Sequence, residues 1–156
     1  MRTMKGFTLM ELVMVILIIG ILAVVAVPRM QLDGYTLHTA SQDLIKAIRY
    51  TQMQSMTHSG APHYQITLNN TGYTVTQAGA AITNPVTGAA SYTEDADLWD
   101  GVTTGSAITI SFNSRGVPCL AAAPCTVAAG ANSTVSLTRG GDTIDVTVER
   151  FTGYAY

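Results

Sequence analysis

The stretch that decides the fold is residues 1–30, MRTMKGFTLMELVMVILIIGILAVVAVPRM. Positions 12–27 are all apolar or glycine, and no charged residue lies between Glu11 and Arg29. As an α-helix, residues 7–28 would be about 33 Å long, which matches the roughly 30 Å thickness of the hydrocarbon core of a bilayer. The pattern therefore predicts an apolar helix over residues 7–28 that enters a membrane.

Glu11 is the exception within this apolar segment. A carboxylate at that depth costs a few kcal/mol unless a partner neutralises it, and ionisable residues inside membrane segments are functional candidates. Arg2 and Lys5 precede the segment. Because positive charge is retained in the cytoplasm, we expect the N-terminus inside the cell and the rest of the chain outside the cytoplasm.

Residues 5–12, KGFTLMEL, resemble the class III signal of type IV pilins and type II secretion pseudopilins. The resemblance implies that prepilin peptidase cleaves the chain between Gly6 and Phe7. It also implies N-methylation of the new amine on Phe7. Residues 1–6 are then a leader peptide, and the mature chain begins with the apolar helix.

Three further residues fall where this family keeps a glutamate, a glycine and a proline: Glu11, Gly20 and Pro28. The resemblance implies that they act in assembly. The Glu11 carboxylate can pair with the amine of Phe7, its own or a neighbour's, and a pair between subunits would set the axial stagger of a filament, because an unpaired charge in a dry core is costly. We expect Gly20 and Pro28 to let the helix unwind when it leaves lipid.

Other interpretations of this segment remain open. The small residues at positions 24–26 are typical of a secretory signal peptide, although the length of the apolar run and the presence of Glu11 argue against one. The segment is also compatible with a simple membrane anchor that never assembles. Glu11 would then be a polar residue tolerated near the membrane interface.

The rest of the chain, residues 29–156, is long enough for one domain with its own core. We expect this domain in the periplasm or outside the cell. The whole chain of 156 residues is 47% hydrophobic, is 12% charged and has a net charge of −2. It therefore lacks the basic excess of a nucleic-acid-binding protein.

A second helical pattern covers about residues 35–59. Its apolar stripe recurs at three- and four-residue steps and consists of Leu37, Ala40, Leu44, Ala47, Ile48 and Thr51. The polar residues that fall largely away from this stripe are Gln42, Asp43, Lys46, Arg49 and Gln52. Ser59, Gly60 and Pro62 are typical of a helix end. The pattern predicts an amphipathic helix whose stripe receives a sheet.

Alternating apolar residues predict strands beyond this helix. Residues 63–68 and 73–75 form one hairpin, residues 107–112 a single strand with Ile108, Ile110 and Phe112 inward, and residues 134–137 and 143–151 a final hairpin. Residues 77–105 have no clear period and are interpreted as a long loop with one possible short strand. One long helix followed by antiparallel strands predicts an α+β fold, and the resemblance implies the pilin fold.

Cys119 and Cys125 enclose a short loop. A disulfide is the default for two cysteines in an exported domain, and their spacing fits no common zinc site. We therefore predict that the two residues are bonded, which would stabilise the folded state by about 2 kcal/mol on the chain-entropy estimate.

Two downstream segments resemble the GspH/FimT group of minor pilins and pseudopilins. They are residues 44–56, LIKAIRYTQMQSM, and residues 110–116, ISFNSRG. A minor pilin of the mannose-sensitive haemagglutinin type is a close candidate within this group. The DNA-uptake members of the group end in a basic tail, whereas this chain has no Arg or Lys after Arg150. Phosphate binding requires cations, so we expect no nucleic-acid partner.

The residue patterns in the domain contain no recognisable set of catalytic residues. We therefore expect that the chain is not an enzyme and binds no cofactor. The histidines at 38, 58 and 63 are scattered. The acidic run Glu94, Asp95, Asp97 and Asp100 is interpreted as a solvated loop, with calcium binding as the alternative. Trp99 is interpreted as a plug over the sheet edge, with a partner anchor as the alternative.

The leading functional hypothesis is a structural minor pilin or pseudopilin that primes assembly or caps the tip of a type IV pilus or type II secretion pseudopilus. We expect it first as a single-pass protein of the inner membrane and then in the fibre. Its partners would be other pilin or pseudopilin subunits, prepilin peptidase, the inner-membrane assembly platform and membrane lipid. The alternatives are an adhesive or ligand-binding pilin that acts through residues 77–105, and a membrane-anchored periplasmic binding domain that never assembles.

Overall fold

The computed structural model of the chain describes residues 8–26, 32–58, 63–105, 107–119, 125 and 129–156. The chain divides into two compact units, Met1–Leu32 and Asp33–Tyr156. The first unit contains helix α1, Leu9–Ala26. Apart from Glu11 its side chains are apolar, so the helix has no polar face.

Helix α2, Leu32–Thr57, is the framework of the second unit. All six residues of the predicted stripe are at most 1% exposed, which confirms the amphipathic pattern. The helix begins before Gly34 rather than after it. A glycine within a helix costs about 1 kcal/mol relative to alanine, and tertiary packing of an apolar stripe readily exceeds that cost.

The larger sheet is antiparallel and has the order β3-β2-β1-β6-β7, with β4 also paired to β2. The hairpin of β1 and β2 was predicted, and its register ends at the pair Asn69↔Gly72, so Asn70 and Thr71 form the turn. The strands of this sheet are β1 (Tyr64–Asn69), β2 (Gly72–Gln77), β3 (Ala80–Ala81), β4 (Tyr92–Thr93), β6 (Ile108–Phe112) and β7 (Pro118–Cys119).

The smaller sheet has the order β5-β8-β9 and consists of β5 (Thr103–Thr104), β8 (Ser133–Arg139) and β9 (Asp142–Val148). The predicted final hairpin is confirmed. Its two turn residues, Gly140 and Gly141, have φ angles of 60° and 94°. Two consecutive positive φ angles are what a tight hairpin turn of type I′ requires, and glycine adopts them without strain.

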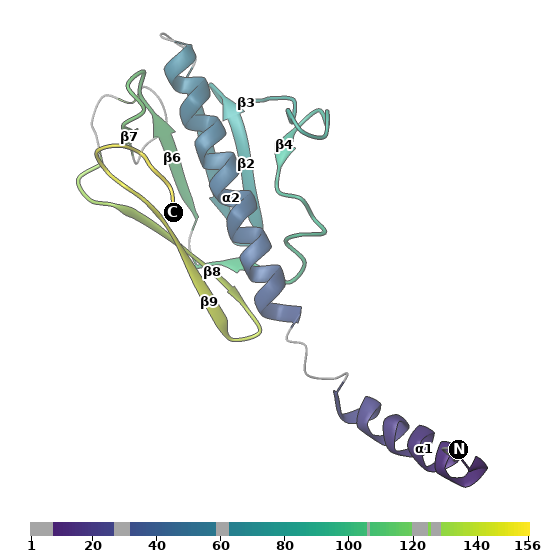
Figure 1. Cartoon of the computed structure of the whole chain (residues 1–156). Helices are drawn as coiled ribbons and strands as arrows, with labels where there is room; N and C mark the ends of the chain where they lie inside the picture. The colour runs from purple at the N-terminus through teal and green to yellow at the C-terminus, as the bar shows by residue number, and fades with distance from the viewer. Residues whose placement is uncertain (1–7, 27–31, 59–62, 106, 120–124, 126–128) are drawn as a thin grey trace, which may run out of the picture. The chain divides into compact units, whose positions relative to one another are not determined.

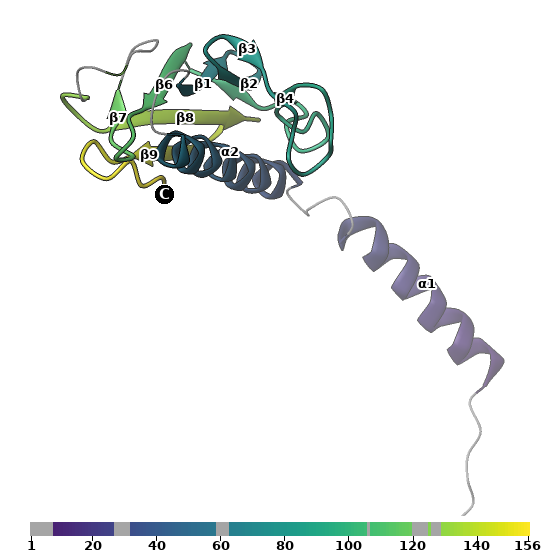
Figure 2. The same cartoon turned by 90° about the horizontal axis from the view of Figure 1, so that it is seen from above.

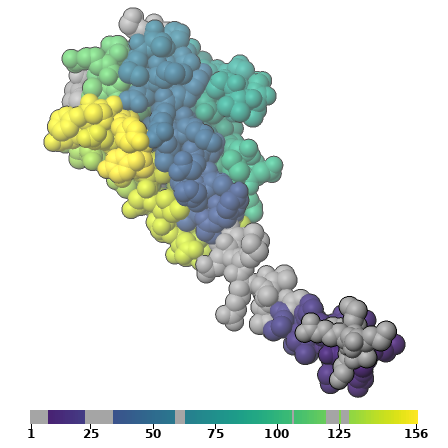
Figure 3. Space-filling view, in the orientation of Figure 1, coloured from purple at the N-terminus to yellow at the C-terminus, as the bar shows by residue number. Residues whose placement is uncertain are grey.

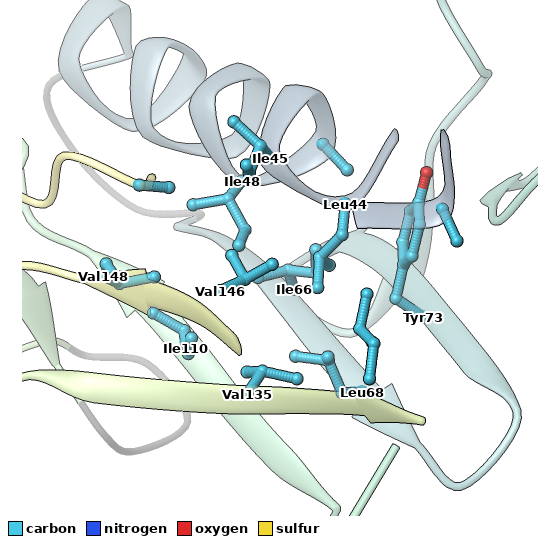
Figure 4. Packing of buried hydrophobic residues seen from close by; sticks show 14 of the residues in the cluster. Leu44, Ile45, Ile48, Ile66, Leu68, Tyr73, Ile110, Val135, Val146 and Val148 are labelled. Carbon is cyan, nitrogen blue, oxygen red and sulfur yellow. The ribbon is translucent and has the colours of Figure 1, made fainter. Parts of the chain in front are cut away.

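Both sheets pack against α2, which confirms the predicted α+β fold and is consistent with a pilin fold (Figures 1 and 2). Figure 4 shows that the core consists of side chains from α2, the larger sheet and the smaller sheet. Leu44 and Ile48 of α2 meet Ile66 of the larger sheet and Val146 of the smaller one, and each of these residues is at most 1% exposed.

Three predictions about the strands need correction. Residues 77–105 contain three strands, β3, β4 and β5, rather than one, and strands of two residues are too short to show a period. The last strand ends at Val148, after which the chain turns and pairs Val148 with Ala155. In β6, Ile108 is only half-buried, whereas Ser111 is fully buried beside β7.

Candidate functional site

The N-terminus of α1 is capped by Thr8. The backbone N–H of Glu11 donates to Thr8 Oγ1 at 3.3 Å and lies 3.1 Å from the Thr8 carbonyl oxygen. Thr8 and Glu11 have the spacing of a capping box, and a carboxylate in the first turn also interacts favourably with the helix dipole. Glu11 thus has a local stabilising position in addition to its expected role, and the Thr-x-x-Glu spacing in the sequence could have revealed it.

The other predicted assembly residues are only partly within the described chain. Gly6, Phe7 and Pro28 lie outside the described residues. Gly20 is in α1, and apart from its two chain neighbours and the backbone of its own helix, no heavy atom of the described chain lies within 4 Å of the position that a Cβ atom would occupy there. The large apolar side chains of α1 from Leu9 to Leu22 are 45–81% exposed.

The predicted membrane helix, residues 7–28, is described only over residues 8–26. No helix in the described parts of the chain reaches the combination of length and hydropathy that a membrane span requires.

The predicted disulfide between Cys119 and Cys125 is present, with Cα atoms 5.6 Å apart. Cys119 is buried in β7, which pairs with β6 through Ser111. The bond therefore attaches Cys125 to β7, the strand at one edge of the larger sheet. Residues 120–124 between the two cysteines lie outside the described residues.

Asp43 connects α2 to the long loop. Its Oδ2 atom accepts hydrogen bonds from the Tyr73 hydroxyl at 2.9 Å and from Trp99 Nε1 at 3.0 Å. Trp99 is only 4% exposed, so it is a plug and the partner-anchor alternative is wrong. Sequence reasoning placed Asp43 on the solvent side of the helix, although buried tyrosine and tryptophan residues usually require a polar partner.

Tyrosine side chains surround this connection. Tyr73 makes edge-on ring contacts with Trp99 at 5.6 Å and with Tyr92 at 6.2 Å between ring centroids. Burial raises the pKa of Tyr73, and the negative charge of Asp43 raises it further. The same two causes raise the pKa of Tyr92 to about 12. The Tyr73 hydroxyl therefore keeps its proton and remains a donor to Asp43 at neutral pH.

The acidic run does not converge on one point. Glu94 Oε2 accepts the Tyr73 backbone N–H at 3.0 Å, Asp95 Oδ1 accepts the Asp97 backbone N–H at 3.0 Å, and Asp100 Oδ2 lies 3.4 Å from Arg139 Nη2. Within the described residues, no three His, Cys, Asp or Glu side chains come close enough together to hold a metal ion. The carboxylates thus make separate interactions with the fold.

A groove of about 430 Å³ lies between α2 and residues 84–98. Figure 3 shows this loop segment, in teal, beside the blue helix. Asp43 and Lys46 line the groove from the helix, and Glu94, Asp95 and Leu98 line it from the loop. This combination of charged and apolar groups in one concave surface is typical of a ligand site. Sequence reasoning pointed to the loop but not to its helical wall.

Comparison with known proteins gives one match. The family model of the prokaryotic N-terminal methylation motif matches residues 1–27. Neither the curated proteins nor the solved structures contain a match to this chain. The matched segment includes Glu11, Gly20 and all of α1, and it ends before the folded second unit.

Proposed function

We propose that this chain, whose residues 1–27 match the prokaryotic N-terminal methylation motif, is a minor structural subunit of a type IV pilus or type II secretion pseudopilus. It acts when assembly begins or at the tip of the fibre. The observation that carries the proposal is the coincidence of the motif, residues 1–27, with an apolar helix that bears a single acidic residue. The α+β fold of the second unit is consistent with this role.

The proposed pathway begins at the inner membrane. The chain spans it once through residues 7–28, with residues 29–156 in the periplasm. Prepilin peptidase removes residues 1–6, and the new amine on Phe7 is methylated. The assembly platform then transfers the subunit from lipid to the fibre, where residues 7–28 are buried among the corresponding helices of other subunits.

Glu11 sets the register of this assembly in the proposed mechanism. It is the only charged residue between Lys5 and Arg29, so in a dry helical bundle it has a strong requirement for a cationic partner. The amine of Phe7 on a neighbouring subunit supplies that partner. Subunits out of register would leave both charges unpaired.

Gly20 and Pro28 adapt the helix to its two environments. The open space at the Cβ position of Gly20 supports a close approach by a neighbouring helix. Pro28 cannot donate a backbone hydrogen bond, so it provides a point at which the helix unwinds as it leaves lipid.

We propose a structural rather than a catalytic role for the chain, because its N-terminal motif is that of the structural pilins and pseudopilins. Nucleic acid is not a proposed partner, because the net charge of −2 provides no basic excess. A second candidate function is ligand binding through residues 77–105. The groove between α2 and residues 84–98 favours it.

Fibre fractionation tests the main proposal. Fibres are sheared from cells that express the chain, purified away from membranes, and examined by immunogold labelling with an antibody against the folded domain. We expect label on the fibres, and we expect the chain to stay with the membranes in a strain without prepilin peptidase. A processed chain found only in membranes would contradict the proposal and favour an anchored domain that never assembles.

A further inference from the structure

We propose that the groove between α2 and residues 84–98 binds an organic cation, namely an ammonium or guanidinium group at the end of an aliphatic stem. This inference rests on the ligand-binding candidate and is independent of incorporation into a fibre. Its basis is the size of the groove and the charged and apolar groups on its walls.

The groove has the size of a binding site. Its volume of about 430 Å³ is within the range of about 300–1,000 Å³ for ligand pockets. One wall is the turn over residues 84–89, where Asn84 Oδ1 accepts the backbone N–H groups of Val86 at 2.8 Å and Thr87 at 3.2 Å. The opposite wall is α2. The side chain of Asn84 therefore stabilises the turn that forms this wall.

Negative charge prevails on the walls of the groove. Asp43, Glu94 and Asp95 contribute three carboxylates, against the single ammonium group of Lys46. A concave surface with apolar walls concentrates the electric field of these charges. Each carboxylate is fixed to the protein through one oxygen (Asp43 Oδ2, Glu94 Oε2 and Asp95 Oδ1). The other oxygen of each forms no hydrogen bond with the residues that the structure describes.

The lining of the groove favours an organic cation over a metal ion. No three acidic or metal-ligating side chains among the described residues are close enough to share one metal. Tyr92 and Leu98 add apolar surface to the same groove. An aliphatic stem can lie on that surface while its charged end reaches a carboxylate, as lysine and arginine side chains do on protein surfaces.

Trp99 provides a built-in reporter for this site. It is the only tryptophan in the chain, it is buried, and its Nε1 atom donates to Asp43 Oδ2 at 3.0 Å. A cation that approaches Asp43 from the groove changes the electrostatic field at the indole ring. Binding is therefore expected to change the intensity or the wavelength of tryptophan emission.

The experiment titrates the full chain in detergent micelles with four probes while tryptophan emission is recorded. The probes are agmatine, an acetylated lysine-containing tripeptide amide, glutarate and a methyl glycoside. We expect saturable changes with the two cations only, and weaker binding as salt screens the charges. Tighter binding of the tripeptide than of agmatine would identify a basic polypeptide segment as the source, whereas the reverse would identify a free amine.

Three variants locate the site. The double variant Glu94→Gln, Asp95→Asn keeps the side-chain oxygens that accept backbone N–H groups but removes two charges, and it should weaken cation binding about tenfold. Lys46→Gln removes the competing positive charge and should strengthen binding about two- to fivefold. Asp97→Asn is the matched control, because this exposed carboxylate is in the same loop but does not line the groove, and it should leave affinity nearly unchanged.

Three results would overturn the inference: no saturable response to either cation, equal binding of the glycoside or glutarate, or undiminished binding by the double variant. The double variant is also examined in purified fibres. If it enters fibres normally while even the unaltered chain binds no cation, only the ligand inference fails. If the unaltered chain is absent from fibres, the structural proposal fails whatever the groove binds.

Discussion

Asp43 shows how a single residue joins two parts of the domain that are distant in sequence. One oxygen of its carboxylate accepts two hydrogen bonds. The donors are the hydroxyl of Tyr73, in the larger sheet, and the indole N–H of Trp99, in the long loop. Both donors belong to buried side chains, and a buried donor without a partner costs about 1–3 kcal/mol. The side chain at position 43 therefore contributes to the packing of the loop against α2.

Asp43→Ala should lower the free energy of unfolding by about 1–3 kcal/mol because it leaves the Tyr73 and Trp99 donors without an acceptor. Asp43→Asn retains an acceptor oxygen and should cost less. Urea unfolding followed by Trp99 fluorescence measures both effects. Gln42→Ala, on the exposed side of the same helix, is the control, and an equal loss in that variant would remove the special role of Asp43.

Stability should fall above pH 10 because two buried tyrosines keep their protons in the folded state. Burial raises the pKa of Tyr92 from its ordinary 10.0 to about 12 and raises that of Tyr73 as well. Between pH 10 and about 12 the unfolded chain loses these protons and the folded chain retains them, so each tyrosine reduces stability by about 1.4 kcal/mol per pH unit. Below pH 10 this stabilising contribution is complete.

The pH effect is measured by urea unfolding at a series of pH values from 9 to 11. Tyr92→Phe removes one of the two hydroxyls and should make the decline above pH 10 less steep. Tyr154 is exposed, so Tyr154→Phe is the control. The stability of this variant should decline above pH 10 as steeply as that of the unaltered chain. A stability that is constant across this pH range would contradict the assignment.

The charge of Glu11 and its place in the first turn of α1 can be tested separately. Glu11→Gln keeps a side-chain oxygen at the fourth residue of the capping-box pattern but removes the charge, whereas Glu11→Val removes both. We expect both variants to enter the membrane and both to be nearly absent from sheared fibres. The ratio of fibre-bound to membrane-bound chain on immunoblots measures this. Normal incorporation of Glu11→Gln would show that the charge is dispensable.

At the scale of the elements, the parts with a long regular period were predictable from sequence. The stripe of α2 has its apolar residues at helical spacing, and the hairpins of β1 with β2 and β8 with β9 combine alternation with turn residues. The two-residue strands β3, β4 and β5 have no such signal, because their pairing partners are set by the folded sheet. Burial of Ser111 likewise follows from its position beside β7 rather than from its polarity.

The contact between α2 and the two loops beside it was also beyond sequence reasoning. Gln52 was expected to lie away from the apolar stripe, but its Nε2 atom donates to the carbonyl oxygens of Gly116 at 2.9 Å and Thr152 at 2.6 Å. A helical period gives the direction of a side chain. It does not indicate that two loops from elsewhere in the chain will end beside it.

Gly153→Ala should destabilise this contact. Gly153 has a φ angle of +68°, and a Cβ atom there would lie 2.6 Å from Gln52 Nε2 and 2.9 Å from Phe112 Cε1. The backbone strain alone costs about 1 kcal/mol, and the crowding adds to it. Gly141→Ala is the matched control, because its φ angle of +94° imposes strain with no atom within 4 Å.

Urea unfolding compares the two glycine variants. We expect a clearly larger loss of stability for Gly153→Ala than for Gly141→Ala, since only the first adds steric crowding to backbone strain. Equal losses in the two variants would mean that the neighbours of Gly153 move aside at no cost, and the contact between α2 and these loops would then be looser than described.

For the whole molecule, the two units differ in how readily their function can be inferred. The N-terminal motif is a contiguous pattern of residue types at fixed spacing, so it is readable from sequence alone and matches a family model over residues 1–27. The groove combines Asp43 and Lys46 with residues 84–98. Only folding brings these positions together, so composition and periodicity contain no sign of it.

The most direct measurement is the intact mass of the chain purified from sheared fibres, with fragmentation to locate its first residue. We predict that the assembled subunit begins at a methylated Phe7, without residues 1–6. A fibre-associated chain that begins at Phe7 without a methyl group would contradict the proposed methylation, and one that retains Met1 to Gly6 would contradict both the proposed cleavage and the pairing of the Phe7 amine with Glu11 that depends on it.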